Sequence, residues 1–240
     1  MIDGLGKVSR PKGTLTVAIH QPEFLPWIGF FNKMYKSDIF VLLDNVQFRR
    51  DYFQNRNVIK TPQGPLKLTV PVLKKGSKQL IKDMIIDNST FWGKKQWKSI
   101  QQNYCKAPFF KNYEEKFAKI YESNWEKLSE LNIALIKLMT ECFGLKKPLV
   151  IASEMESEGN STDLLLGICE KLEATTYLSG IFGKDYLEED KFKIKGINVE
   201  YNHFNHPKYP QLWGSFQTNM SAIDLLFNCG ESSIEYIEKS

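Results

Sequence analysis

The sequence is poor in cysteine, and its few cysteines do not form the patterns that bind metals or make disulfides. Four cysteines occur in 240 residues, no two of them form a CxxC pair, and all fall in predicted helices. This spacing argues against a zinc site and against a disulfide framework. We therefore expect buried thiols in a reducing compartment.

Long apolar runs are missing as well. No segment approaches the roughly 20 apolar residues that span a bilayer, so no membrane span is expected. The first residues, Met1–Lys12, are polar and contain glycine, without the apolar core of a signal peptide. Together these absences predict a cytoplasmic protein.

A strong charge of one sign is also absent. The net charge is +4 and is spread along the chain, whereas nucleic-acid-binding proteins cluster their positive charge, so no nucleic-acid partner is expected.

No GxSxG elbow is present, and no cysteine sits at a predicted strand end, which disfavours covalent catalysis. His203 and His206 lack acidic or cysteine neighbours at ligand spacing, so we expect no resident metal. The sequence leaves one alternative open, in which a phosphate-bearing substrate brings a divalent ion that Asp44 binds.

Arginine is scarce, and its placement is informative. Four of the 32 basic residues are arginines, and three of them, Arg49, Arg50 and Arg56, fall within eight residues, while Arg10 lies elsewhere. The planar guanidinium binds phosphate or carboxylate through two parallel hydrogen bonds, which lysine does not offer. The cluster therefore predicts an anion-binding loop; the alternative is a solvated basic loop.

The segment Thr14–Asp44 carries the densest information. Thr14–Ile19 and Asp38–Asp44 read as buried strands, and Ile28–Lys36 between them has helical spacing. A strand–helix–strand unit of this size makes its two strands parallel. Because ligands of open parallel sheets bind beyond the carboxyl ends of the strands, His20 and Asp44 are active-site candidates.

The rest of the chain predicts an α/β fold. Asn45–Thr61 reads as a ligand-contacting loop, and Leu66–Val72 and Leu80–Asp87 as two strands that pair as a hairpin at a sheet edge. Residues 88–144 have a helical pattern, with aromatic residues at core spacing. Further strands are expected at 148–152, 175–178 and 197–201, with helices at 161–173 and from 220 or 221 to 229.

These elements predict a mostly parallel Rossmann-like sheet with an edge hairpin and an all-helical insertion. The expected parts are an N-terminal α/β half with the active-site loop, a helical insertion and a C-terminal α/β half, forming one compact domain overall. Their bounds are residues 1–87, 88–147 and 148–240.

The three histidines all follow a predicted strand. They are His20, His203 and His206. A neutral imidazole at such a position can act as a general base or donate to a phosphate oxygen, and a hydrogen-bonded structural histidine is the alternative. The turn Ser179–Asp185 also follows a strand, and two glycines there let the backbone approach an anion.

Several stretches of the chain resemble the WbqC-like protein family. The most specific are Ile19-His20-Gln21-Pro22 with Leu25-Pro26-Trp27, and Gln54-Asn55-Arg56-Asn57. The other matching stretches are Leu43–Phe48, Lys60-Thr61, Thr69–Val72, Tyr177–Gly180, Gly183–Leu187, His206-Pro207, Tyr209–Gln211 and Met220–Leu226.

The resemblance implies a bacterial protein of surface-polysaccharide (O-antigen) biosynthesis that modifies a nucleotide-linked amino sugar, with acyl or aminoacyl transfer to its amine as the expected reaction. The start of the chain is also similar to HxGH-type nucleotidyltransferases. The second histidine of that motif is missing here, because the helix opens Trp27-Ile28-Gly29. A nucleotidyltransferase-like enzyme and a non-catalytic sugar-nucleotide binding protein remain the alternatives.

Site roles follow from these patterns and the resemblance. The expected catalytic residues are His20 as base, Asp44 as its orienting partner, and His206. The expected substrate-binding residues are Gln21, Trp27, Gln47, Arg49, Arg50, Gln54, Asn55, Arg56, Asn57, Ser179, Gly180, Gly183, Lys184, Asp185, His203, Tyr209 and Gln211.

The expected partner is a nucleotide-sugar substrate, and no cofactor is expected to be tightly bound. The expected reaction needs an activated acyl donor, either a coenzyme A thioester or a thioester of an acyl carrier protein. The aromatic-rich helical insertion leaves room for a homodimer face.

Overall fold

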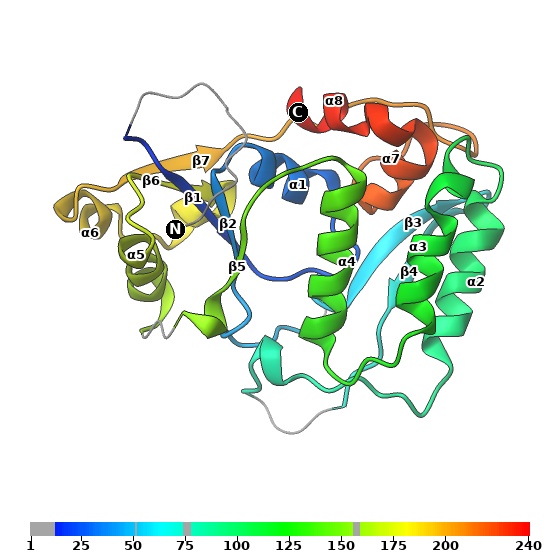
Figure 1. Cartoon of the computed structure of the whole chain (residues 1–240), viewed down its shortest axis with the longest axis horizontal. Coiled ribbons are helices and arrows are strands. Elements are labelled where there is room, and N and C mark those ends of the chain that lie inside the picture. The colour runs from blue at the N-terminus through cyan, green and yellow to red at the C-terminus, as the bar shows by residue number, and fades with distance from the viewer. Residues whose placement is uncertain (1–12, 51, 74–77, 156–158) are drawn as a thin grey trace. The chain divides into compact units, whose positions relative to one another are not determined.

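The computed structural model describes residues 13–50, 52–73, 78–155 and 159–240 (Figure 1). Arg10 and the rest of the polar start of the chain lie outside the described residues. The chain forms two compact units, each assembled from separate segments. The first unit comprises the described parts of 1–21, 32–44 and 146–205, and the second those of 22–31, 45–145 and 206–240.

The first unit is built on a parallel sheet, as the sequence predicts. Its strands are β1 (Thr16–His20), β2 (Ile39–Leu42), β5 (Leu149–Ile151), β6 (Thr176–Gly180) and β7 (Asn198–Asn202), in the order β5-β2-β1-β6-β7. The chain builds outward from β1 through β2 to β5, and then continues on the other side of β1 with β6 and β7. The strand order therefore reverses between β1 and β6. In open α/β sheets this switch point, at the carboxyl ends of the strands, is where ligands bind.

Short helices accompany this sheet in the first unit (Figure 1). They are α5 (Ser161–Lys171), the 3₁₀ turns η2 (Ala152–Glu154) and η3 (Ile181–Asp185), and α6 (Glu189–Ile194). Each of η2 and η3 begins directly after a strand, so the chain turns back at the carboxyl edge of the sheet. The strands β1 and β2 are buried because their apolar side chains are covered on both faces.

The second unit contains the hairpin, which differs from the predicted one. The antiparallel pair is β3 (Arg56–Thr61) with β4 (Gly64–Thr69), and it forms its own two-stranded sheet rather than an edge of the parallel sheet. The predicted strand at 80–87 is wrong: it contains the 3₁₀ turn η1 (Ile81–Asp83) and only isolated bridges. The sequence misleads here because β3 carries polar residues, Asn57 and Lys60, that are buried.

Helices cover the hairpin in the second unit. The predicted insertion is present as α2 (Trp92–Tyr104), α3 (Phe110–Glu122) and α4 (Leu128–Cys142), and the closing helix as α7 (Ala222–Cys229). The turn η4 (Gly230–Ser232) and α8 (Ser233–Glu238) follow and were not predicted. The phenyl ring of Phe227 packs edge-on against Tyr104, Phe110 and Phe117, so the aromatic residues of the insertion form a core, as expected.

Helix α1 (Ile28–Tyr35) contributes its first four residues to the second unit and its last four to the first. Among the described residues, no helix is long and apolar enough to cross a membrane. All four cysteines are free thiols. Cys169 and Cys229 are buried as predicted, but Cys142 is only partly buried, and Cys105, which caps α2, is exposed.

Candidate functional site

His20 is the last residue of β1 and stands at the switch point of the parallel sheet. Its Nδ1 lies 3.0 Å from the carbonyl oxygen of Gln21. Only a protonated nitrogen can donate to a carbonyl, so this contact assigns the proton to Nδ1 and leaves Nε2 unprotonated in the neutral ring.

The surroundings of His20 keep its ring neutral. Burial, followed by the positive charge of Lys33, lowers the pKa of His20 to about 3. Lys33 is itself buried, and its Nζ donates to the carbonyl oxygen of Ile19, 2.7 Å away. The imidazole is therefore a neutral acceptor over the whole physiological pH range.

Asp44 follows β2 at the same edge of the sheet, but its carboxylate is held by another residue. Its Oδ1 accepts from the amide of Ser153 at 2.9 Å, and its Oδ2 from the Ser153 hydroxyl at 2.7 Å. Ser153 belongs to η2, the turn after β5. Asp44 thus joins the ends of two strands, while the group that orients the His20 ring through Nδ1 is the Gln21 carbonyl. The catalytic role of Asp44 stays a prediction.

The turn after β6 completes this edge of the first unit. Ser179 is buried and hydrogen-bonded to Tyr177, and a Cβ placed on Gly183 would meet the Ser179 hydroxyl at 2.1 Å. Gly183 is therefore needed for close packing of the turn. Gly180 borders open space, and the Nζ of Lys184 lies 5.0 Å from the Tyr201 ring centroid.

Two further predicted residues of the first unit, Asp185 and His203, have exposed side chains. Asp185 is the last residue of η3, and His203 follows β7. The carbonyl oxygen of His203 accepts from Lys36 at 3.3 Å. The structure thus brings His20, Ser179 and Gly180 to one edge of the sheet by strand order, and their binding roles stay predictions.

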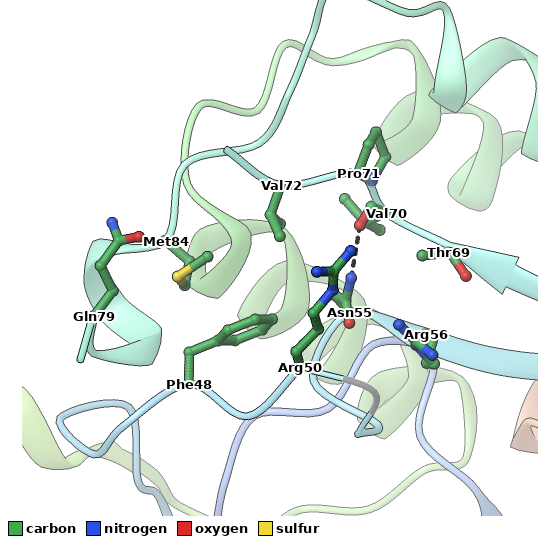
Figure 2. A pocket seen from close by; sticks show the side chains of 10 residues that line it. All are labelled: Phe48, Arg50, Asn55, Arg56, Thr69, Val70, Pro71, Val72, Gln79 and Met84. Atoms are coloured by element: carbon green, nitrogen blue, oxygen red, sulfur yellow. Dashed lines mark hydrogen bonds between the residues drawn. The ribbon is translucent and has the colours of Figure 1, made fainter. Parts of the chain in front are cut away.

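The second unit contains a cavity of about 740 Å³, within the range usual for ligand sites. Arg50 and Arg56 both line it, so two members of the predicted arginine cluster share one cavity (Figure 2). The other lining residues are Phe48, Asn55, Thr69, Val70, Pro71, Val72, Gln79 and Met84.

Arg49, the third member of the cluster, is not among the residues that line this cavity. Its guanidinium lies over the Tyr52 ring, 5.1 Å from the centroid, and its amide donates to Gln54 Oε1 at 2.8 Å. Two guanidinium groups in one cavity give it the positive charge that a diphosphate requires.

The amide residues beside the arginines have different surroundings. Both side-chain atoms of Asn57 are used within the protein: Nδ2 donates to Leu25 O at 2.7 Å and to Phe24 O at 3.3 Å, and Oδ1 accepts from Val58 N. Asn57 thus fixes the turn before α1, where Leu25 has a φ of 45°. Asn55 differs, because its side chain lines the cavity.

The remaining predicted binding residues lie apart from the cavity lining. Gln21 provides the carbonyl that orients His20, and Gln47 is exposed and forms an isolated bridge with Leu80. Trp27 bridges to Ser221, and its ring covers Gly29 so closely that a Cβ there would lie 2.4 Å from it. The close packing of the Trp27 ring explains why a glycine stands at position 29, in the first turn of α1.

A buried polar network in the second unit includes residues that sequence reasoning did not single out. Asp224 is fully buried and accepts from the hydroxyls of Tyr104 (2.7 Å) and Tyr209 (2.8 Å) and from Gln211 Nε2 (2.7 Å). Lys60 Nζ donates to Gln211 Oε1 at 3.0 Å. Burial lowers the pKa of Lys60 and raises that of Asp224. The sequence signal for Lys60 and Asp224 was their place in stretches that resemble the family, Lys60-Thr61 and Met220–Leu226.

His206 lies beside this network and has both ring nitrogens engaged. Nδ1 donates to Pro207 O at 2.9 Å, and Nε2 accepts from the amide of Asn219 at 3.1 Å. Burial lowers the pKa of His206. These contacts favour a structural histidine; the predicted catalytic role of His206 and the binding roles of Tyr209 and Gln211 stay predictions.

Across the described parts of the chain, no group of three or more histidine, cysteine and acidic side chains could hold a metal ion.

The chain matches the sequence model of the WbqC-like protein family over residues 21–236. It is 34% identical over 224 residues to the "Uncharacterized protein Rv1507c" of Mycobacterium tuberculosis, covering 92% of this chain and 96% of that protein. No solved structure matches the chain.

Proposed function

The chain belongs to the WbqC-like protein family, and from that membership we propose that it is a transferase that acylates the amine of a nucleotide-linked amino sugar. The proposal includes a role in bacterial surface-polysaccharide biosynthesis. The observation that carries the catalytic part is His20, a neutral imidazole at the switch point of a parallel sheet with its proton on Nδ1.

In the proposed reaction, the sugar amine attacks the carbonyl carbon of a thioester. A C–N bond forms, the C–S bond breaks, and the thiol of coenzyme A or of a carrier protein leaves with a proton. Nε2 of His20 takes the proton that the amine loses, and the Gln21 carbonyl holds the ring in the tautomer that this step requires. The reaction proceeds without a covalent enzyme intermediate.

Arg50 and Arg56 are the proposed ligands of the substrate's diphosphate. Both line the cavity of the second unit, and Arg56 is held in position on β3. Each guanidinium can form two parallel hydrogen bonds with phosphate oxygens. Arg49 is left out of this part of the proposal, because its guanidinium lies over the Tyr52 ring.

The test is a direct assay of the purified protein. UDP-, GDP- and dTDP-linked amino sugars are incubated with acetyl-coenzyme A or with an aminoacyl thioester, and products are followed by mass spectrometry together with thiol release. The proposal predicts one acylated sugar nucleotide for each thiol released. Failure of every pair to react, in a protein that binds the sugar nucleotide, contradicts transfer and leaves a binding function.

That binding function is the second candidate, and one observation favours it. A pKa of about 3 makes His20 a weak base, since proton transfer is most efficient when the pKa of the base is near the working pH. A neutral imidazole of this kind equally serves as a hydrogen-bond acceptor for a bound sugar. The two candidates differ in turnover and not in ligand.

A further inference from the structure

The parallel sheet of the first unit splits at its carboxyl edge, between β1 and β6. The register that joins these two strands ends at the pair Ala18–Leu178. Each strand runs two residues further, to His20 and to Gly180, and there β1 remains paired with β2, and β6 with β7. The ends of β1 and β6 therefore diverge, as strands do where a switch point opens a crevice. His20 stands on one side of this split and Gly180 on the other.

His20 and Gly180 also share one face of the sheet. Paired residues of parallel strands point to the same face, and so does every second residue along a strand. Since Ala18 pairs with Leu178, the residues two positions further, His20 and Gly180, belong to the same face. Both residues are partly exposed, so a ligand that enters the split can reach them.

Gly180 lacks the usual structural reasons for a glycine. Its backbone is extended, with φ −72° and ψ 158°, a conformation that L residues adopt freely. A Cβ built on Gly180 would meet no atom within 4 Å, whereas one on Gly183, in the same turn, would lie 2.1 Å from the Ser179 hydroxyl. A glycine in a strand lowers stability and often marks a place where a ligand approaches closely. At the split, the space beside Gly180 is therefore room for a ligand.

We infer that the acceptor amine reaches Nε2 of His20 through the split between β1 and β6, and that Gly180 keeps this path free of side-chain atoms. The inference rests on the proposed function, which makes His20 the base, and it adds a residue that determines access to that base. A side chain at position 180 would stand on the same face of the sheet as the imidazole. An amine on a sugar ring is flanked by two further carbons, so it needs more room beside the base than a linear amine does.

Chemical modification tests access to the imidazole of His20 without any substrate. Diethylpyrocarbonate acylates neutral imidazole nitrogens, and the chain has three histidines, so mass spectrometry of peptides follows each one separately. We expect His20 to react in the wild type and to react at least about 10-fold more slowly in Gly180→Val, because the added side chain blocks the approach of the reagent. His203, an exposed residue of the same unit, is the internal control and should react equally in both proteins.

Matched variants separate access from stability. Gly180→Ala should melt at or above the temperature of the wild type, because alanine adopts this backbone conformation and restricts the unfolded chain. Gly180→Val should lose about 100-fold in turnover, as expected when reacting groups are displaced by about 1 Å, and Gly180→Ala should lose less. Gly167→Ala, on α5 of the same unit, also places its Cβ in open space and should leave both turnover and His20 modification unchanged.

Each outcome bears on a separate claim. His20 that does not react in the wild type, or that reacts equally fast in the folded position-180 variants, overturns the path. Turnover that is unchanged in Gly180→Val overturns it as well. His20 modification that slows in Gly180→Val, in a protein that forms no amide from any donor and acceptor, supports the path as the approach of a ligand and removes the transfer reaction of the proposed function.

Discussion

At the scale of single residues, His20, the proposed base, also makes the free energy of unfolding depend on pH. The unfolded chain binds a proton at His20 near pH 6.5, whereas in the folded protein burial and the charge of Lys33 hold its pKa at about 3. Between these values the unfolded state binds more protons, so the free energy of unfolding falls as the pH falls. Above pH 6.5 the ring is neutral in both states and contributes no pH dependence.

The substitution His20→Gln removes this acid-dependent loss. The free energy of unfolding of the variant, minus that of the wild type, should be about 1–2 kcal/mol larger at pH 5.0 than at pH 7.5. The reason is that one bound proton contributes about 1.4 kcal/mol per pH unit. Urea unfolding of both proteins at the two pH values measures the difference, and every other titrating group is common to both. An equal difference at pH 7.5 and 5.0 would show that the His20 pKa is not lowered.

At the scale of elements, the turn before α1 depends on one side chain of β3. Asn57 donates to Leu25 O and Phe24 O, two carbonyls of a buried segment that has no regular secondary structure. Asn57→Ala should therefore lower the free energy of unfolding by about 1–3 kcal/mol, because it leaves buried carbonyls without donors. Asn112→Ala, an exposed position on α3, should change it by less than about 0.5 kcal/mol. Similar urea midpoints for the two variants would contradict this role of Asn57.

The elements also show what a single sequence can and cannot reveal. The parallel strands were predictable, because Val17–Ile19 and Ile39–Leu42 are continuous apolar runs, as expected for strands covered on both faces. Strand β3 was not, because Asn57 and Lys60 are buried only through partners far along the chain, such as Gln211. From the sequence alone, a buried polar residue is predicted to be exposed, because its hydrogen-bond partner is not known.

At the scale of the whole molecule, the chain divides into two units with different candidate roles. The first carries His20 at the switch point of a parallel sheet, and the second carries the cavity lined by Arg50 and Arg56. The sequence identified His20 and the arginine cluster, because strand ends and rare residue types are visible in it. It could not show that Asp44 binds Ser153, 109 positions away, or that Arg50 and Arg56 line one cavity.

This division predicts that binding and turnover respond to different substitutions. Arg56→Ala should weaken the binding of a sugar nucleotide by about 10-fold or more, since a charged hydrogen-bond pair contributes roughly 1.5–3 kcal/mol. Arg49→Ala should weaken it much less, because that guanidinium lies over Tyr52. Calorimetric titration with the sugar nucleotide compares them, and equal losses would remove Arg56 from its assigned role.

The most direct test of the account is the rate of amide formation by His20→Gln at saturating sugar nucleotide and thioester. General-base assistance contributes roughly 10² to 10⁴ in rate. We predict that the variant loses at least about 100-fold in turnover at pH 7.5, while its affinity for the sugar nucleotide and its melting temperature stay near those of the wild type. Turnover within a few-fold of the wild type would show that the imidazole of His20 does not take the proton from the amine.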